Sequence, residues 1–491
     1  MLGGAPLPSL ERRLGPWDAA AIVISNVIGV GIFITPGFIA TLLPNRAAIL
    51  GVWALGGALA LFGALAYAEL AARQPEAGGE YVYLREAFGG LAAFLTGWTS
   101  FVAGFSGAIA AGGVGVAAYL DKLIPGVGNE TPIGAWHIGP LAITLSIRAL
   151  VAIGIIVALA LIQMRGVGLG RVLQNSLTTM KVLALLVFAA VGLVVTAVNA
   201  QPAFPSGSPV HATSWLLALV PVMFSYTGWN AAVYVAEEIR DPVRNVPRAL
   251  LIGTTITVAL YLALNALYLR VVPQDQFLGK VAVGEVAAER LFGSAAAVLF
   301  SVVAVVIILS SLSAMTTAGP RVYFAMARDG AFVPAAARVH PRYRTPAFAI
   351  IAQAIWSALL VLSGTFDQLL TYTGFGVILF SALAVLSLFV VRRTAAQAAV
   401  FRAWGYPWAP GLFCLVGFAI VINTIRSEPG VAFAGLGVMA AGIPIYWWVK
   451  QKDRRLRAEG RGRSTEGKGQ RAKGKGRRAK GEGQRAQHRG P

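Results

Sequence analysis

Charge and cysteine are both scarce in this sequence. Charged residues make up 13% of the 491 positions, whereas soluble domains carry about 25%. The single cysteine, Cys414, excludes an intramolecular disulfide. The four histidines show no metal-ligand spacing, and the sequence has no Gly-x-x-x-x-Gly-Lys phosphate loop. We therefore expect no enzyme chemistry, no cofactor or metal site, and no ATP-driven pump.

Apolar runs fill most of the chain, which is 57% hydrophobic. Many of these runs are long enough to cross a bilayer, which takes about 20 residues. The pattern predicts an all-α polytopic membrane protein with twelve transmembrane helices. The predicted spans are residues 17–40, 48–72, 88–120, 143–163, 173–198, 214–237, 249–269, 294–318, 347–362, 369–391, 410–425 and 431–449.

Basic residues cluster in alternate loops. If the N-terminus lies inside, the inner loops hold groups such as Arg12-Arg13, Arg342 with Arg344, and Arg392-Arg393, and the outer loops hold only scattered ones. Positive charge favours the cytoplasmic side. We therefore expect a multi-pass protein of the cell membrane with both termini in the cytoplasm.

The C-terminal residues 451–491 are basic and almost free of large apolar side chains. Such a segment cannot bury a core, so it is expected to be disordered. Its positive charge favours contact with anionic lipid, to which each Lys or Arg contributes about 1 kcal/mol. We prefer this interpretation to nucleic-acid binding.

Two predicted spans carry poor helix formers near their middle. Backbone exposed at membrane depth is tolerated only within protein or along a wet cavity, and matching breaks in two halves point to a transporter site. Donors freed at the first break would hold a carboxylate, and carbonyls freed at the second, over 225–228, would hold an ammonium. Helix packing by glycine is the alternative. The predicted substrate-binding residues are Ser25, Asn26, Ile28, Gly29, Val30, Gly31, Phe224, Ser225, Tyr226, Thr227, Gly228 and Asn230.

Four motifs resemble those of a known family. The chain is similar to the amino acid–polyamine–organocation superfamily over roughly residues 17–448, and most similar to the L-type amino acid transporter branch and its bacterial relatives. The motifs are Gly29-Val30-Gly31-Ile32-Phe33, Tyr67-Ala68-Glu69-Leu70 with Gly78-Gly79-Glu80-Tyr81, Phe224-Ser225-Tyr226-Thr227-Gly228-Trp229-Asn230, and Glu237-Glu238-Ile239-Arg240-Asp241-Pro242-Val243-Arg244-Asn245-Val246-Pro247.

The resemblance implies amino acid transport and a five-plus-five inverted repeat with discontinuous helices 1 and 6. It also implies an aromatic gate at Phe224. Family members often carry Ala where this chain has Ser225 and Gly where it has Thr227, which leaves the substrate side chain open. The expected parts are an N-terminal segment 1–16, repeats at 17–200 and 213–392, two further helices at 408–450, and the tail 451–491.

Lys181 is the most informative charge. It lies ten residues after Arg171, about 15 Å along a helix, near the middle of a membrane core about 30 Å thick. A charge there indicates function by default; snorkelling is the alternative. In related sodium-coupled folds this region holds a cation, so Lys181 would replace sodium, with Ser310 and Ser311 lining its pocket. A permanently charged Lys181 favours an exchanger, and one that deprotonates favours a proton symporter.

Two further groups of residues can each be interpreted either as a gate or as a structural feature. Tyr372 is a candidate outer gate, with a glycine-softened packing face as the alternative. The charged residues from Glu237 to Arg248 are either an inner gate or a capped, ion-paired loop.

The predicted function is sodium-independent secondary transport of neutral L-amino acids by alternating access. A carrier of cationic amino acids or polyamines is the alternative, although Glu69 and Asp367 lie near span ends and no acid is expected mid-membrane. A channel is the remote alternative. The expected partners are the amino acid and membrane lipid, without nucleic acid and without a disulfide-linked heavy chain, for which Cys414 is poorly placed.

Overall fold

The computed structural model of the chain is a helical bundle with one small hairpin. It describes residues 10–29, 31–138, 141–199, 211–278, 283–364, 366–394 and 399–451. The chain divides into a unit that ends at Gly442 and a second unit from Ile443, whose described part is helical. Everything below concerns the first unit.

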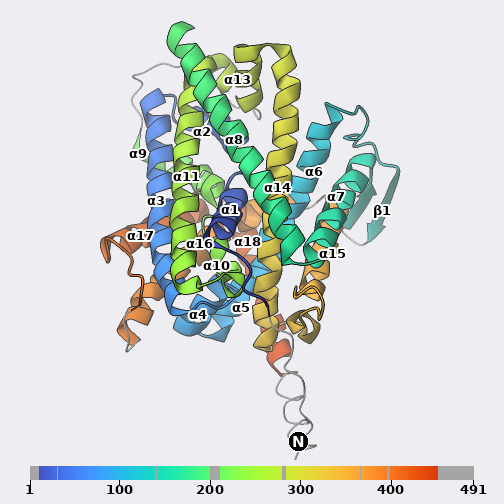
Figure 1. The fold of residues 1–491 in the computed structure, drawn as a ribbon, viewed down its shortest axis with the longest axis vertical. Helices are drawn as coiled ribbons and strands as arrows, with labels where there is room; N and C mark the ends of the chain where they lie inside the picture. Colours follow the sequence, from blue (N-terminus) through green and yellow to red (C-terminus); the bar gives the residue numbers. More distant parts are fainter. Residues whose placement is uncertain are drawn as a thin grey trace, which may run out of the picture. The chain divides into compact units, whose positions relative to one another are not determined.

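Helices form nearly all of this unit, and Figure 1 shows α1 in the interior, with α8, α11 and α14 packed around it. The helices are α1 (Pro16–Val27), α2 (Gly31–Leu42), α3 (Arg46–Arg73), α4 (Glu80–Phe88), α5 (Gly90–Thr99), a π-helical turn η1 (Ser100–Gly104), α6 (Phe105–Asp121), α7 (Ile147–Met164), α8 (Val167–Asn199), α9 (Ala212–Tyr226), α10 (Ala231–Tyr234), η2 (Ala236–Glu238), α11 (Pro242–Val271), α12 (Gln274–Phe277), α13 (Val283–Phe292), α14 (Ser294–Arg328), η3 (Pro334–Ala337), α15 (Ala347–Ser363), α16 (Phe366–Thr394), α17 (Trp408–Ser427) and α18 (Pro429–Ala440).

Several helices match the length of a bilayer. Within the described residues, nine helices are long and apolar enough to cross a membrane, and the bent pair α1–α2 would be a tenth. Two shorter apolar helices, Ser214–Tyr226 and Ala347–Ser363, fall below this length. The prediction of a polytopic helical protein is confirmed, whereas the number twelve stays a prediction.

The fourth predicted span begins later than expected. Strands β1 (Gly134–Ile138) and β2 (Leu141–Leu145) pair antiparallel where residues 143–145 were predicted to be helical. Helix α7 starts only after Ser146, whose hydroxyl accepts a hydrogen bond from the Ala149 amide at 3.2 Å. This N-cap sets the boundary, because it satisfies an amide that has no partner within the helix.

Both predicted interruptions are present. Helix α1 ends at Val27, α2 begins at Gly31, and the pair is bent by 43°. The second break lies two residues later than predicted: α9 is helical through Tyr226, and a turn covers residues 227–230. The Ser225 hydroxyl donates to the carbonyl of Pro221, one helical turn back, which is compatible with the helix continuing past this residue.

The two breaks lie against each other. Gly228 has φ +107°, and a Cβ there would lie 2.8 Å from the carbonyl carbon of Asn26. A Cβ on Gly31 would lie 2.9 Å from Ser225 Oγ. Glycine is required at position 228, because any other residue would be strained at this positive φ and its Cβ would contact the backbone of Asn26.

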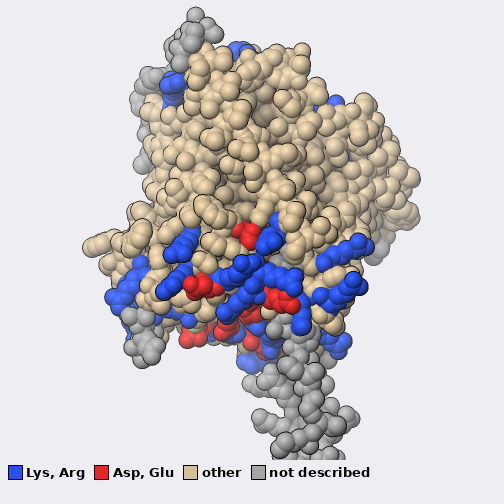
Figure 2. Space-filling model, viewed as in Figure 1, with Lys and Arg blue, Asp and Glu red and all other residues tan. Residues whose placement is uncertain are grey.

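One end of the bundle carries a charged network. Figure 2 shows Lys, Arg, Asp and Glu gathered around the end where α4 and α10 lie, with a largely uncharged surface above it. Within it, Arg321 contacts Glu238 through two bonds of 2.7 and 3.0 Å, and both side chains are almost fully buried. The N-terminal segment joins this network, because the Leu14 amide donates to the Glu238 carbonyl at 2.9 Å.

We expect Gly228→Ala to lower thermal stability and abolish substrate binding, because a strained backbone conformation costs about 1–3 kcal/mol and the new methyl group displaces Asn26. The matched control is Gly154→Ala on α7, where a Cβ would meet no atom within 4 Å. Tm measured by tryptophan fluorescence should fall for the first variant only; equal values for both would refute the close approach.

Glu238→Gln should be strongly destabilising, because it leaves Arg321 buried without a carboxylate, and breaking a buried pair costs about 3–5 kcal/mol. Glu76→Gln is the control, since the Glu76–Arg85 pair is exposed and such pairs contribute about 0–1 kcal/mol. The measurement is Tm in detergent. A loss no larger than that of the control would mean that the buried pair is not formed.

Candidate functional site

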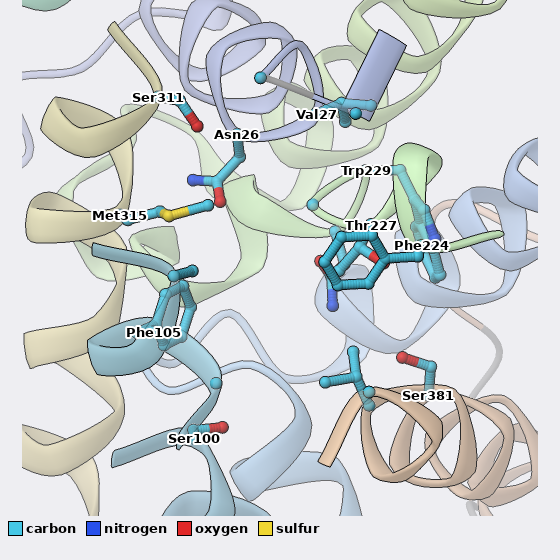
Figure 3. A pocket seen from close by; sticks show the side chains of 18 of the residues that line it. Asn26, Val27, Ser100, Phe105, Phe224, Thr227, Trp229, Ser311, Met315 and Ser381 are labelled. Carbon is cyan, nitrogen blue, oxygen red and sulfur yellow. The ribbon is translucent and has the colours of Figure 1, made fainter. Parts of the chain in front are cut away.

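A cavity of about 250 Å³ opens beside the two breaks. Pockets for drug-sized ligands span about 300–1,000 Å³, so this one suits a smaller molecule. Its wall is mainly apolar. Figure 3 shows the side chains of Asn26, Phe105, Phe224, Met315 and Ser381 arranged around one space, each from a different helix.

Most predicted substrate-binding residues line this cavity, but some do not. Tyr226 faces α3, where its hydroxyl donates to the Trp53 carbonyl at 3.1 Å. Tyr372 lies within α16, but its side chain is outside the described residues, as is Val30. The predicted residues that line the cavity are Asn26, Gly29, Gly31, Phe224, Ser225, Thr227, Gly228, Asn230 and Ser311. Those placed behind its wall are Ser25, Ile28, Tyr226, Lys181 and Ser310.

The first break presents polar groups to the cavity. The side chain of Asn26 is only 6% exposed, and its Nδ2 has no hydrogen-bond partner among the described residues. A Cβ built on Gly29 would lie 3.5 Å from the hydroxyl of Ser311 on α14, so this hydroxyl lies beside the bare backbone. A buried donor without a partner is costly, and a ligand acceptor beside Asn26 would remove that cost.

Tyr261 of α11 ties the two breaks together. Its fully buried hydroxyl lies 2.9 Å from the Val27 carbonyl and 3.2 Å from the Ser225 carbonyl. These carbonyls belong to the last turns of α1 and α9, where intrahelical partners run out. One hydroxyl therefore serves both helix ends, and the sequence pattern did not single it out.

Phe224 is the most exposed large side chain of the second break. It is 45% exposed, although it sits beside the buried Ser225. Ser225 is held by two contacts, with Thr35 Oγ1 at 2.7 Å and with the Pro221 carbonyl at 3.0 Å. The arrangement leaves the Phe224 ring free to cover a ligand, and its predicted gating role stays a prediction.

Lys181 lies directly behind the first break. It is fully buried, and its Nζ donates to the carbonyl of Ile28 at 2.6 Å and to that of Ser25 at 3.3 Å. Both carbonyls are at the C-terminal end of α1, which carries the negative end of the helix dipole. Lys181 has no carboxylate partner among the described residues. The charge is therefore held by backbone carbonyls.

A chain of hydroxyls surrounds the same helix end. Ser25 Oγ lies 2.5 Å from Thr178 Oγ1 and 2.8 Å from Ser310 Oγ. These side chains come from α1, α8 and α14, and all three are buried. The surroundings of Lys181 are thus built by α1, α8 and α14, with Ser310 beside Ser25. Ser311 instead lines the cavity.

Glu80 is a site residue that the sequence analysis missed. It lines the cavity, is 7% exposed, and its Oε1 accepts bonds from Tyr67 (2.6 Å), Asn230 (2.8 Å) and Ser381 (3.2 Å). Burial raises its pKa, and these hydrogen bonds partly offset that rise. The available signal was an acid directly after Gly78-Gly79 and before a long apolar run, but it was taken as a family motif only.

The third predicted span contains an irregular turn at the cavity. A π-helical turn at Ser100–Gly104 separates α5 from α6, and both Ser100 and Gly104 line the cavity. Such turns are rare and are frequent at functional sites. They leave no clear mark in residue spacing, so sequence reasoning predicted a single helix here.

Taken together, the cavity is bordered by the unpartnered Asn26 amide and the Ser311 hydroxyl at the first break, and by Ser225, Thr227 and Gly228 at the second. Gly31, which also lines the cavity, begins α2, and a helix N-terminus favours a negatively charged group. Within the described residues, no cluster of His, Cys, Asp or Glu is arranged to hold a metal ion.

Comparison with known proteins agrees with this geometry. The amino acid permease family model matches residues 14–449. The chain is 29% identical to the human b(0,+)-type amino acid transporter 1, over 86% of this chain and 84% of that protein. It is 27% identical to the serine/threonine exchanger SteT of Bacillus subtilis, over 90% and 98%, and 27% identical to the human large neutral amino acids transporter small subunit 2, over 89% and 80%. The chain therefore belongs to the amino acid permease family, in the L-type branch of the amino acid–polyamine–organocation superfamily.

Proposed function

We propose that this chain is a sodium-independent secondary transporter that moves neutral L-amino acids across the cell membrane by alternating access. The observation that carries the proposal is the ammonium group of Lys181 on the carbonyls of Ser25 and Ile28. A positive charge at that place removes the need for a bound cation, because it already neutralises the negative end of α1.

The amino acid is held by its α-carboxylate and its α-ammonium group. Its carboxylate accepts hydrogen bonds at Gly29 and Gly31, and its ammonium group donates to carbonyls around Phe224 and Thr227. The largely apolar wall, with Met223, Phe224 and Ile308 among its residues, then receives a neutral side chain. The serine/threonine exchanger and the large neutral amino acids transporter among the relatives support this substrate class.

The topology in the membrane is part of the proposal. Counting α1–α2 and the two shorter apolar helices as spans gives twelve crossings. We assign the first ten to two inverted repeats of five, and the last two lie outside the repeats. The charged end of the bundle shown in Figure 2 carries the basic loops and therefore faces the cytoplasm. Cys414, 6% exposed on α17, is poorly placed for a disulfide to a second subunit.

Transport assays on proteoliposomes test the role of Lys181. We expect the wild type to take up a labelled neutral amino acid equally in sodium and in choline. Lys181→Met keeps an unbranched side chain that is one atom shorter but leaves two carbonyls without a donor, which costs about 1–3 kcal/mol each, so uptake should fall at least about tenfold. Lys122→Ala, which removes an exposed lysine paired with Glu285, is the control.

Two outcomes would contradict this proposal. One is sodium-stimulated uptake by the wild type, and the other is full activity of Lys181→Met with correct folding in the presence of ligand. A channel would instead show conductance far above carrier turnover and no counterflow.

The same vesicles separate exchange from proton symport. Uptake that requires internal amino acid indicates an exchanger with a permanently charged Lys181. Uptake into empty vesicles that rises as the external pH is lowered, with acidification of the lumen, indicates a proton symporter.

A further inference from the structure

Glu80 is the one charged residue among the described residues that line the cavity. Its Oε1 is occupied by the donors of Tyr67, Asn230 and Ser381. Oε2 receives no hydrogen bond from the described residues, and the residue keeps 7% of its surface exposed, on the cavity wall. The carboxyl group therefore has one oxygen held by three donors and one without a donor among the described residues, in a residue that lines the cavity.

Burial opposes the ionised form of Glu80, and the hydrogen bonds from its neighbours favour that form. Three donors converge on one oxygen, and the amide nitrogen of Asn230 can only donate. Hydrogen bonds to the charged form stabilise it. Glu80 forms no ion pair among the described residues, unlike the buried Glu69, which pairs with Arg73 and Arg392. A buried anion without a counter-ion is costly, and a cation brought by a ligand would relieve that cost.

Glu80 also lies on the side of the cavity away from Asn26 and Ser311. Figure 3 shows Ser381 on the opposite side of the space from Asn26 and Ser311, and Glu80 is hydrogen-bonded to Ser381. The proposed function places the carboxylate of the substrate at Gly29 and Gly31 and its ammonium group at Phe224 and Thr227. The end of a long side chain is then assigned to the remaining part of the cavity, beside Ser381 and Glu80.

We propose that Glu80 is a specificity-determining residue, whose Oε2 accepts a hydrogen bond from a cationic group at the far end of a substrate side chain. This inference rests on the proposed function, because it uses the same head-group site. The cavity then takes dibasic amino acids as a second substrate class beside neutral ones, which reverses the expectation that no acid is placed to hold a second ammonium group.

Lysine and norleucine provide the sharpest pair of probes, because they differ only by the terminal ammonium group. We expect the purified wild type to bind lysine at least as tightly as norleucine, measured by calorimetry. In Glu80→Gln the ratio of lysine to norleucine affinity should fall by about tenfold or more. Glu80→Asp retains the charge and should keep a higher ratio than Glu80→Gln. Glu76→Gln, which removes an exposed acid outside the cavity, should leave the ratio unchanged.

Several outcomes overturn the inference. It fails if the wild type binds norleucine but not lysine, a result that needs no variant to fold, or if Glu80→Gln leaves the ratio unaltered. It also fails if norleucine binding is strengthened by sodium or potassium over N-methylglucamine and this effect is lost in Glu80→Gln, because Glu80 then holds an inorganic cation. Failure of the wild type to transport norleucine at all would instead contradict the proposed function.

Discussion

Backbone groups are freed at two helix breaks deep inside an apolar bundle, and the surrounding structure must supply their hydrogen-bond partners. Such groups are costly unless they find partners. Tyr261 serves the carbonyls of Val27 and Ser225, and Lys181 serves those of Ser25 and Ile28. Asn26 Nδ2 has no partner among the described residues, and Asn26 borders the cavity, where a ligand can accept a hydrogen bond from it. The packing around the two helix breaks and the proposed ligand binding therefore both depend on the interruption of α1 and α9.

Side chains behind α1 and glycines at the two breaks have different roles, and both suit a transporter. Lys181, Thr178 and Ser310 contact α1 from behind, outside the cavity wall. Gly31 and Gly228 bring the breaks close enough that one small molecule can contact both. In the proposed binding mode the ligand bonds to two helices at once, which couples its arrival and departure to their movement.

Sequence alone predicted the helical membrane class, the two breaks and a functional charge at Lys181, because glycine, proline and an isolated charge in apolar runs carry strong physical penalties. The position of Lys181 at a cation region was implied by the family resemblance. Sequence reasoning misplaced the second break by two residues, since Ser225 is helical when its hydroxyl bonds back to Pro221. Tyr226 and Glu80 show the limit. Which face of a helix meets the cavity depends on packing among distant segments. Sequence reasoning therefore included Tyr226, whose hydroxyl bonds to Trp53 on α3, and overlooked Glu80, which lines the cavity.

The central claim is that both ends of an amino acid are recognised by backbone groups of the two breaks. It is tested most directly by calorimetry with a neutral amino acid that binds, its decarboxylated amine and its deaminated acid. The account predicts that only the intact amino acid binds and that each truncated compound loses about a hundredfold or more in affinity, since charged hydrogen bonds contribute about 1.5–3 kcal/mol each. Equal affinity for the amine would contradict it.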